Sequence, residues 1–451
     1  MNILNAERIY FIGIGGIGMS ALARYFLHQG KQVGGYDRTE TALTQTLTSL
    51  GADIHYQDNF NEISELFKDA SKTLVVYTPA IPASHQELKT FQTRDFTILK
   101  RSQVLGSIAN QGYCMAVAGT HGKTTTSAIL AHLLKECGIK VTAFLGGILE
   151  NTNSNLVLEG SDVMVVEADE FDRSFLQLQP DVACITSMDA DHLDIYDSHE
   201  NLQATFKEFA ERVKKPNALY IRQGLPLQGI SFGLDASANI SAKQIRVENG
   251  GYVFDIHAEG ECIHSVRFEL PGYHNIANAL AAFAMALNVC DSKEQLAKAL
   301  STFQGVHRRF SYRLKSPKVL IDDYAHHPSE IDAVYQAVST FYPGKKNVAV
   351  FQPHLFSRTR DFCDAFAKSL SQFDAVILLD IYPAREEPIP NVSSTVLLDK
   401  ISLKNKQLVS KAQLIHQSQL LTSDVVVMMG AGDIADEVRS VQQKIAMQNE
   451  I

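Results

Sequence analysis

Short apolar runs rich in β-branched residues recur along the chain, and most of them are followed by a segment with helical periodicity. The runs span residues 9–12, 74–77, 115–117, 163–166, 348–351, 376–379 and 425–429. After the first run, Met19, Leu22 and Phe26 recur at the spacing of one helix face. Strands that alternate with helices favour parallel sheets covered by helices, so the pattern predicts an α/β protein.

One stretch breaks this alternation of strands and helices. Between about residues 240 and 270, polar and apolar residues alternate, and Asn249-Gly250-Gly251 interrupts them. An Asn-Gly pair between two alternating segments is typical of a β-hairpin. We therefore expect a small antiparallel sheet in this part of the chain.

The length of 451 residues exceeds that of one ordinary core and indicates about three domains. No Pro/Ser-rich linker marks the boundaries, so they are placed by counting the strand and helix modules. We predict domains at residues 1–107, 108–311 and 312–451.

Composition and charge exclude several classes of partner. Lys and Arg number 41 against 50 Asp and Glu, and a net charge of -9 repels nucleic acid and anionic lipid surfaces. No apolar run approaches 18 residues, and the N-terminal segment is too short for a secretory signal. The 6 cysteines lack CxxC spacing and favour buried free thiols. We therefore expect a cytoplasmic protein with neither a nucleic-acid nor a membrane partner.

A first glycine-rich loop joins a predicted strand to a predicted helix. It contains Gly13, Gly15, Gly16 and Gly18, and Asp37 ends the next strand 19 residues later. Glycines let the backbone approach phosphates at a helix N-terminus, so the loop favours a dinucleotide or a pyrophosphate. The residue pattern alone favours NAD, and a tight turn without a ligand is the alternative.

A second glycine-rich loop also lies between a strand and an amphipathic helix. It reads Gly119, Thr120, His121, Gly122, Lys123, Thr124, Thr125. The loop resembles a P-loop, in which backbone amides hold phosphates, the lysine binds the outer phosphates and the hydroxyl binds magnesium. Val117 stands where the general pattern has glycine. ATP is therefore the expected nucleotide, and a glycine turn without nucleotide is the alternative.

Acidic residues follow two of the predicted strands. Glu167 comes directly after the run 163–166, at the carboxyl end of the sheet, and its hard oxygens suit Mg²⁺ beside a triphosphate. His192 lies among Asp189, Asp191 and Asp194 after another strand. A solvated acidic turn and a surface histidine are the respective alternatives.

The cations near these motifs indicate the reaction. A γ-phosphate and a carboxylate repel each other, so a site that joins them needs positive charge. Lys123, His192 and one of the pair Arg308 and Arg309 are available together with magnesium. We therefore expect an ATP-dependent ligase that activates a carboxylate and joins it to an amine, although the arginine pair could instead form a solvated face.

The chain resembles the Mur ligases, and most closely the branch that joins L-alanine to UDP-N-acetylmuramate. The resemblance covers nearly the whole chain and is carried by motifs in the order of the family. These motifs occupy residues 13–20, 119–126, 167–172, 189–194, 272–279, 307–310, 322–328, 351–359, 381–388 and 430–434. The resemblance implies peptidoglycan precursor synthesis through an acyl phosphate, with ATP and Mg²⁺.

The implied fold is α/β with three domains. The N-terminal domain is Rossmann-like, the central domain is a P-loop-type mononucleotide-binding sheet with a small antiparallel sheet, and the C-terminal domain is Rossmann-like. By the same resemblance, the loop with Gly13, Gly15, Gly16, Gly18 and Asp37 binds the UDP-sugar rather than a nicotinamide.

The resemblance also assigns roles to individual residues. Lys123, His192 and Arg309 are the expected catalytic residues, and Thr124, Glu167 and His192 the expected magnesium ligands. ATP is expected to contact the second glycine loop and also His274, Asn275, Asn278, Arg309 and Asp322. The residues expected to line the alanine site are Tyr324, His326, His354 and Arg358.

Four positions depart from the pattern of the family, among them Leu355, where many relatives carry arginine. The others are Tyr36, Phe171 and Ser187. Three rival functions fit part of the pattern: a sister ligase that attaches a murein tripeptide to the same nucleotide, an NAD-dependent oxidoreductase, and an ATP-binding regulatory module. The Gly13-Ile14-Gly15 start disfavours the first, and the P-loop with its carboxylates disfavours the other two.

Overall fold

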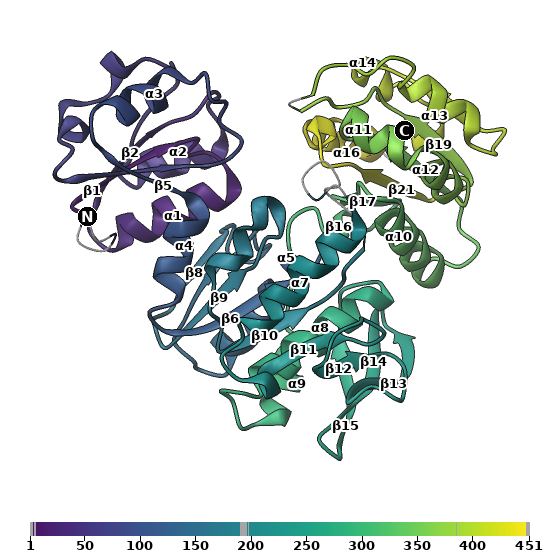
Figure 1. Cartoon of the computed structure of the whole chain (residues 1–451). Coiled ribbons are helices and arrows are strands. Elements are labelled where there is room, and N and C mark those ends of the chain that lie inside the picture. Colours follow the sequence, from purple (N-terminus) through teal and green to yellow (C-terminus); the bar gives the residue numbers. More distant parts are fainter. Residues whose placement is uncertain (1–2, 4–5, 190–195, 197, 385, 448–451) are drawn as a thin grey trace. The chain divides into compact units, whose positions relative to one another are not determined.

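The computed structural model describes residues 3, 6–189, 196, 198–384 and 386–447. Within these residues the strands form three separate sheets (Figure 1). The chain divides into two compact units, of which the first contains residues 1–245, 253–268 and 277–304 and the second contains 246–252, 269–276 and 305–451. The three separate sheets confirm the three-domain α/β architecture predicted from the sequence, and the two compact units group these sheets by contacts.

The first sheet has five parallel strands in the order β3-β2-β1-β4-β5. Its strands are β1 (Arg8–Ile12), β2 (Gln32–Tyr36), β3 (Asp53–His55), β4 (Thr73–Tyr77) and β5 (Thr97–Lys100). Its helices are α1 (Ile17–His28), α2 (Ala42–Ser49), α3 (Gln86–Thr93) and α4 (Arg101–Ala109), with short helices η2 (Phe60–Glu62) and η3 (Glu65–Lys68). Ile12, Phe67 and Phe91 belong to a core cluster on this sheet, which fixes where the loop after β1 emerges.

The second sheet has ten strands in the order β15-β14-β13-β12-β11-β10-β6-β9-β7-β8. The strands are β6 (Tyr113–Ala118), β7 (Val141–Phe144), β8 (Leu156–Leu158), β9 (Val163–Glu167), β10 (Val182–Ile185), β11 (Leu219–Arg222), β12 (Ile230–Gly233), β13 (Ile240–Glu248), β14 (Gly251–Ala258) and β15 (Glu261–Phe268). The helices are α5 (Lys123–Glu136), η4 (Phe171–Gln177), α7 (His199–Glu211), η5 (Pro216–Ala218), α8 (Tyr273–Ala286) and α9 (Lys293–Leu300).

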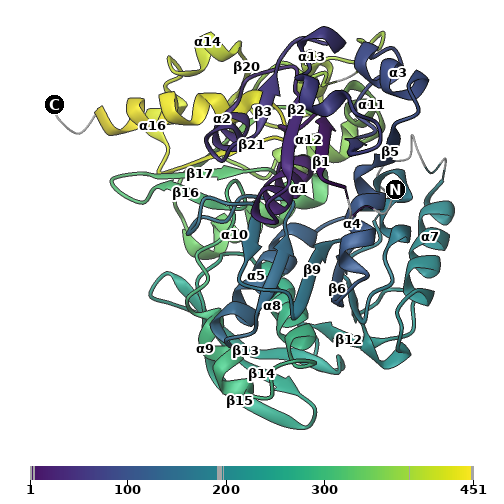
Figure 2. The same ribbon diagram turned by 90° about the vertical axis from the view of Figure 1, so that its left-hand side faces the viewer.

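One edge of the second sheet is the antiparallel stretch expected from the sequence. Two residues connect β13 to β14 and two connect β14 to β15, and connections this short join only antiparallel strands. The strands lie side by side in Figures 1 and 2. At the other end of the sheet, β6 lies between β9 and β10, so the residues that follow these three parallel strands come out at the same edge.

The third sheet has six strands in the order β16-β17-β21-β18-β19-β20, and only β16 is antiparallel to its neighbour. The strands are β16 (Ser311–Leu314), β17 (Val319–Asp323), β18 (Asn347–Phe351), β19 (Ala375–Leu378), β20 (Lys406–Leu408) and β21 (Val425–Met429). The helices are α10 (Pro328–Phe341), α11 (Phe356–Asp361), α12 (Cys363–Leu370), α13 (Ser394–Lys400), α14 (Lys411–Leu414), α15 (Gln419–Thr422), η6 (Asp433–Glu437) and α16 (Val438–Met447). Two apolar clusters, one on each face of this sheet, form its core.

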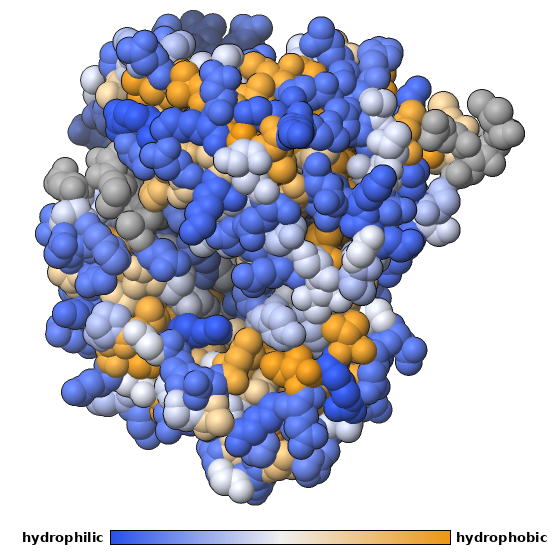
Figure 3. All heavy atoms as spheres, turned by 90° about the vertical axis from the view of Figure 1, so that its right-hand side faces the viewer, coloured by the Kyte–Doolittle hydropathy of each residue, from blue (hydrophilic) through white to orange (hydrophobic). Residues whose placement is uncertain are grey.

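The surface and the cysteines complete the description of the fold. Among the described residues, no helix combines the length and the apolar character needed to cross a membrane. The face drawn in Figure 3 is mostly hydrophilic, with apolar side chains in small groups. All six cysteines are free thiols. Cys114, Cys184 and Cys290 are buried as predicted, whereas the other three are partly exposed.

Candidate active site

The second glycine loop connects the buried strand β6 to helix α5 and has a backbone that only glycine adopts easily. Gly119 has φ +133° and Gly122 has φ +84°. A Cβ atom at Gly119 would strike Thr186 and one at Gly122 would lie 2.7 Å from Asn278 Oδ1. Both glycines are therefore required by the packing of the loop against β10 and α8.

Lys123 begins α5 and points back over the loop. Its Nζ donates to the carbonyl oxygen of Gly119 (2.5 Å) and to both carboxylate oxygens of Glu170 (2.7 and 3.0 Å). Burial lowers the pKa of Lys123, but the charges of Glu170, Asp169 and Glu167 outweigh burial and raise it above its ordinary value. The lysine is therefore a fixed positive charge at the N-terminus of α5. The sequence had left Glu170 without a role.

Thr124 and Glu167 form a pair of hard oxygen ligands beside this lysine. The Thr124 hydroxyl donates to Glu167 Oε1 (2.9 Å), and the backbone N–H of Gly146 donates to Glu167 Oε2 (2.8 Å). A hydroxyl and a carboxylate held together next to a phosphate-binding loop suit Mg²⁺. Two of the three residues predicted as metal ligands, Thr124 and Glu167, are therefore neighbours, and their chemistry fits that ion.

Ser187, which follows β10, holds the middle of the glycine loop in place. Its hydroxyl accepts from the N–H of His121 (2.7 Å) and lies 2.9 Å from Thr120 Oγ1. The hydroxyl of Thr120 in turn accepts from the N–H of Asp189 (3.0 Å). Sequence reasoning noted Ser187 only as a departure from the family pattern. His192, together with Asp191 and Asp194, lies outside the described residues.

The first glycine loop connects β1 to α1 and differs from the second in its contacts. The N–H of Gly15 donates to Asp37 Oδ2 (2.7 Å), and Gly13 has φ +88°. A Cβ atom at Gly15 would lie 2.8 Å from Thr44 Cγ2 and 2.9 Å from Asp37 Oδ2. Gly15 is therefore needed for contact with Asp37 and α2. That Gly15 also makes room for a pyrophosphate stays a prediction.

Helix α1 begins directly after this loop with unpaired backbone donors in its first turn. Gly16 is its N-cap residue and provides no side-chain cap. The first N–H groups of a helix carry partial positive charge and attract anions. Gly18 lies so close to Arg101 that a Cβ atom at this position would meet the guanidinium group. An arginine from α4 therefore lies beside the start of α1.

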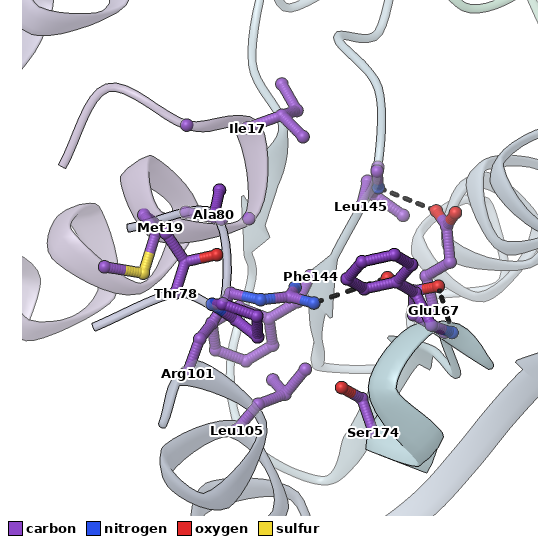
Figure 4. A pocket seen from close by; sticks show the side chains of 17 residues that line it. Ile17, Met19, Thr78, Ala80, Arg101, Leu105, Phe144, Leu145, Glu167 and Ser174 are labelled. Carbon is purple, nitrogen blue, oxygen red and sulfur yellow. Dashed lines mark hydrogen bonds and ion pairs between the residues drawn. The ribbon is translucent and has the colours of Figure 1, made fainter. Parts of the chain in front are cut away.

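A cavity of about 340 Å³ lies between the first glycine loop and the acidic segment after β9. Its lining includes Gly16, Ile17, Gly18, Arg101 and Glu167. In Figure 4, Arg101 extends across the cavity from the side of Met19 and Thr78, and Glu167 lies on the opposite side. The Arg101 guanidinium is 3.5 Å from a carboxylate oxygen of Asp169. One cavity thus joins the N-terminus of α1 to a predicted magnesium ligand.

The second compact unit gathers another set of predicted site residues around the end of β17. The Arg309 guanidinium lies 5.2 Å from the centre of the Tyr324 ring and 3.8 Å from Glu330 Oε1. The ring centre of His326 lies 5.2 Å from that of Tyr324, and its Nδ1 lies 3.3 Å from Glu330 Oε2. Glu330, on the first turn of α10, is therefore the shared carboxylate of this cluster.

His354 extends this cluster towards α11. Its ring centre is 6.1 Å from that of His326 and 5.7 Å from the stacked ring of Tyr382. Arg358, which is buried on α11, has a guanidinium nitrogen 3.4 Å from His354 Nδ1. Leu355 is the N-cap residue of α11 and has φ +70°, which is rare for a leucine. The four residues predicted for the alanine site therefore lie in one cluster.

Two adjacent aspartates at the end of β17 have different roles. Asp322 accepts from Arg308 (3.4 Å) and Arg313 (3.2 Å). Asp323 is buried and accepts from the N–H groups of Phe310 and Ala325, both at 2.7 Å. Burial raises the pKa of Asp323 to about 6, although the charge of Arg309 opposes this. Asp323 thus connects Phe310, which follows Arg309, to Ala325 after β17 through these two hydrogen bonds. No signal in the sequence indicated this role.

The remaining residues predicted to bind ATP lie on two helices. His274, Asn275 and Asn278 belong to the first two turns of α8, where the Asn275 side chain donates to the carbonyl oxygen of Pro271 (2.6 Å). Thr125 is buried in the first turn of α5. The closeness of Asn278 to Gly122 described above brings this α8 residue next to the second glycine loop.

Comparison with known proteins places each part of the chain in one family. Residues 8–113 match the family model described as Mur ligase family, catalytic domain. Residues 117–286 match the Mur ligase middle domain, and residues 308–432 match the Mur ligase, glutamate ligase domain. These three matches follow one another in the order of the three sheets.

Individual relatives match over their whole length. The UDP-N-acetylmuramate–L-alanine ligase of Christiangramia forsetii is 54% identical over 441 residues, which cover 97% of this chain and 98% of that protein. The enzyme of the same name from Flavobacterium psychrophilum is 54% identical over 446 residues, 99% of each chain. The crystal structure of UDP-N-acetylmuramate-alanine ligase MurC from Thermotoga maritima has a TM-score of 0.83 at 27% identity and covers 98% of this chain and 99% of its own. From these matches, the chain belongs to the Mur ligase family.

Proposed function

We propose that this protein joins L-alanine to the lactyl carboxylate of UDP-N-acetylmuramate in an ATP-dependent reaction of peptidoglycan precursor synthesis. Relatives of that name match this chain at 54% identity from end to end. The structural observation that carries the proposal is the cavity lined by both Gly16 to Gly18 and Glu167. The cavity places a pyrophosphate-type loop opposite Glu167, whose carboxylate accepts from Thr124 at the end of the phosphate-type loop. Phosphorylation of a nucleotide-linked carboxylate requires the two groups to be this near.

The chemistry explains why a ligase of this kind needs a phosphate donor. An amine does not displace oxygen from a carboxylate, because the charge on the carboxylate repels the nucleophile and oxide is a poor leaving group. Phosphorylation turns one carboxylate oxygen into part of a leaving group, and attack by the amine then gives the amide and phosphate. The protein contributes positioning and neutralisation of charge.

We assign the neutralisation of charge to the second glycine loop. Lys123 is held charged beside the amides of that loop and faces the phosphates of ATP. Thr124 and Glu167 hold Mg²⁺, which offsets the charge of the phosphates when it is bound. His192 is proposed as a further ligand from the resemblance alone. In the same way, His274, Asn275 and Asn278 are proposed near the adenine.

We assign the nucleotide-sugar to the first glycine loop and the amino acid to the second compact unit. The uncapped N–H groups of α1 suit the pyrophosphate, and Arg101 lies beside them. In the second unit, Arg358 offers a buried cation for the alanine carboxylate. His354 lies against Arg358, and His326 and Tyr324 continue the cluster from His354. Arg309 is proposed at the γ-phosphate and Asp322 at the ribose of ATP.

The remaining proposals concern domain boundaries and compartment. Boundaries near residues 107 and 311 are supported by three separate sheets and by family matches to 8–113, 117–286 and 308–432. A cytoplasmic location is supported by six free thiols and by the use of ATP as a substrate.

The direct test is phosphate release from ATP with UDP-N-acetylmuramate and each standard amino acid in turn. L-alanine should give the highest kcat/KM, with formation of the amide verified by mass spectrometry. A murein tripeptide in place of alanine tests the sister ligase. Higher kcat/KM with the tripeptide, or phosphate release without an amide, would reject the proposal.

An isotope experiment tests the acyl phosphate itself. With heavy oxygen in both carboxylate positions of UDP-N-acetylmuramate, the oxygen that bridges to phosphorus leaves with phosphate when the amine attacks. Each phosphate released should therefore carry one heavy oxygen per amide formed. Unlabelled phosphate at full amide yield would contradict this route.

A further inference from the structure

A second group of metal-ligating side chains lies on the hairpin formed by β14 and β15, away from the residues assigned above. Asp255 and His257 are on β14, and Cys262 and His264 are on β15. Residues two apart on a strand project from the same face of a sheet. Each strand therefore presents two potential ligands to one face.

The turn of this hairpin fixes which side chains face each other. Only Glu259 and Gly260 separate the strands, and both have positive φ, +55° and +81°. This is the geometry of a two-residue turn that matches the twist of a hairpin. The register of such a hairpin places His257 opposite Cys262 and Asp255 opposite His264.

The distances between the four side chains agree with this register. Cys262 Sγ lies 3.5 Å from His257 Nε2 and 3.5 Å from His264 Nδ1. His264 Nδ1 lies 3.1 Å from Asp255 Oδ2. Ligand atoms about 2.0–2.3 Å from a tetrahedral zinc ion are separated by about 3.3–3.8 Å, which is close to these three distances. His257, whose ring nitrogen contacts Cys262, would complete the four ligands by a movement of its side chain. Asp255, Cys262 and His264 all have ligand atoms within 4.8 Å of one another.

A backbone hydrogen bond orients one side chain of the cluster, and another side chain of the cluster is open to solvent. The backbone N–H of Ser265 donates to Asp255 Oδ1 (2.8 Å), which orients the other carboxylate oxygen towards His264. Asp255 is buried, whereas the side chain of His264 is 73% exposed, so an ion can enter from solvent. Glu259 and Glu261 add negative charge at the turn, and Lys293 bridges them at 3.0 Å each.

We propose that Asp255, His257, Cys262 and His264 form a binding site for a transition-metal ion such as Zn²⁺. Sulfur and imidazole ligands select zinc-like ions over Mg²⁺ and Ca²⁺, which prefer oxygen. The bound ion links β15, the edge strand of the second sheet, to β14.

The experiment titrates the metal-free full-length protein with Co²⁺ in excess Mg²⁺ and follows the thiolate-to-cobalt absorption band. The band requires a cysteine ligand, so the oxygen ligands proposed for ATP-bound magnesium do not produce it. We expect one equivalent of Co²⁺ to give the band and Zn²⁺ to displace it. A protein that shows no such band would overturn the proposal.

Variants locate the site. Cys262→Ser should abolish the band, and His264→Gln should weaken zinc affinity by at least about tenfold in calorimetry. Cys363→Ser, which changes a partly exposed thiol on α12, is the matched control and should bind like the unmodified protein. Circular dichroism verifies that each variant is folded, and the exposure of His264 favours this. Unchanged zinc stoichiometry and affinity in the folded His264→Gln variant would contradict the site.

Discussion

The two glycine loops of the first compact unit have the same layout, but a carboxylate contacts the first loop and a lysine ends the second. Each follows a buried parallel strand and begins a helix. After the first loop, α1 starts with no side-chain cap, and the carboxylate of Asp37 accepts from a loop amide. After the second loop, α5 starts with Lys123, which is bonded to Glu170. Only the second loop adds a fixed cation and a pair of oxygen ligands.

Two buried carboxylates show the same contrast. Glu170, near the second loop, is 1% exposed and pairs with Lys123 at 2.7 Å. Glu87, in the first domain, is fully buried, accepts from the Tyr10 hydroxyl at 2.8 Å and lies 3.3 Å from His55. Burial raises the pKa of Glu87 to about 7 and lowers that of His55. The spacing of glycines in a loop therefore does not determine which ligand the loop binds. The charged side chains near the loop also decide it.

Removal of Lys123 should have the largest effect. Lys123→Ala removes the cation of the second loop, so we expect kcat to fall by at least about 10³-fold. Binding of UDP-N-acetylmuramate, measured by calorimetry, should change little because it relies on the first loop. Lys135→Ala, at the other end of α5, changes a lysine paired with the exposed Glu159 and serves as control.

The double variant Lys123→Ala with Glu170→Gln separates catalysis from stability. Lys123→Ala leaves a buried carboxylate without its lysine, which destabilises the fold. The second substitution should recover stability but not turnover. Recovery of turnover in the double variant would mean that Lys123 serves mainly to neutralise Glu170.

Glu167→Gln should have the next largest effect. The substitution removes the charge from one of the two proposed ligands but preserves an oxygen acceptor for Thr124. We expect the Mg²⁺ concentration needed for half-maximal activity to rise by about 10- to 100-fold. Glu159→Gln is the exposed control. Equal magnesium dependence of the two variants would argue against Glu167 as a ligand.

Glu87→Gln should change how stability depends on pH. Burial raises the pKa of Glu87 from its ordinary value of 4.5 to about 7 in the folded protein. The stability contributed by the protonated group is complete below the lower value and is lost as the pH rises through about 7. A neutral glutamine avoids this loss. Urea unfolding should show the variant gaining about 2 kcal/mol relative to the original protein between about pH 5 and about pH 8. A pH-independent difference would refute the prediction.

We expect the smallest effect, a loss of stability, from alanine substitutions at two neighbouring glycines of the first loop. A Cβ atom at Gly15 would lie 2.8 Å from Thr44, whereas one at Gly16 would meet nothing closer than 3.5 Å. Gly15→Ala should therefore lower the free energy of unfolding by about 1–2 kcal/mol, and Gly16→Ala by less than about 0.5 kcal/mol. Thermal unfolding measures both. Equal losses would show that the packing against Asp37 and Thr44 is not what requires glycine.

The sequence predicted most of the fold because its signals are local. The apolar runs at 115–117 and 163–166 lie within β6 and β9, and both glycine loops begin helices as expected. The Asn249-Gly250 pair also falls at the turn between β13 and β14. A strand, a turn and a helix each depend on neighbours in the chain, which a single sequence displays.

The contacts within the candidate site were harder to predict because they depend on neighbours in space. Three acidic residues, Glu167, Asp169 and Glu170, lie within four positions at the end of β9, and the sequence does not say which one turns towards Lys123. Asp172 and Arg173 have φ values of +54° and +53°, so the backbone reverses direction just after Glu170. Ser187 contacts the glycine loop because β10 pairs with β6, a pairing made across more than sixty residues.

The second compact unit is assembled from three separate stretches of the chain, with consequences for its synthesis. Tyr252 packs against Phe341 with ring centres 5.0 Å apart, and its hydroxyl accepts from the N–H of Gly272. On the ribosome, residues 246–252 and 269–276 emerge before 305–451, the part that completes their unit. These early segments therefore complete their contacts with α10 only after the C-terminal stretch has been made. A single proteolytic cut near residue 304 would release the C-terminal sheet and α10 without Tyr252, which packs against this helix.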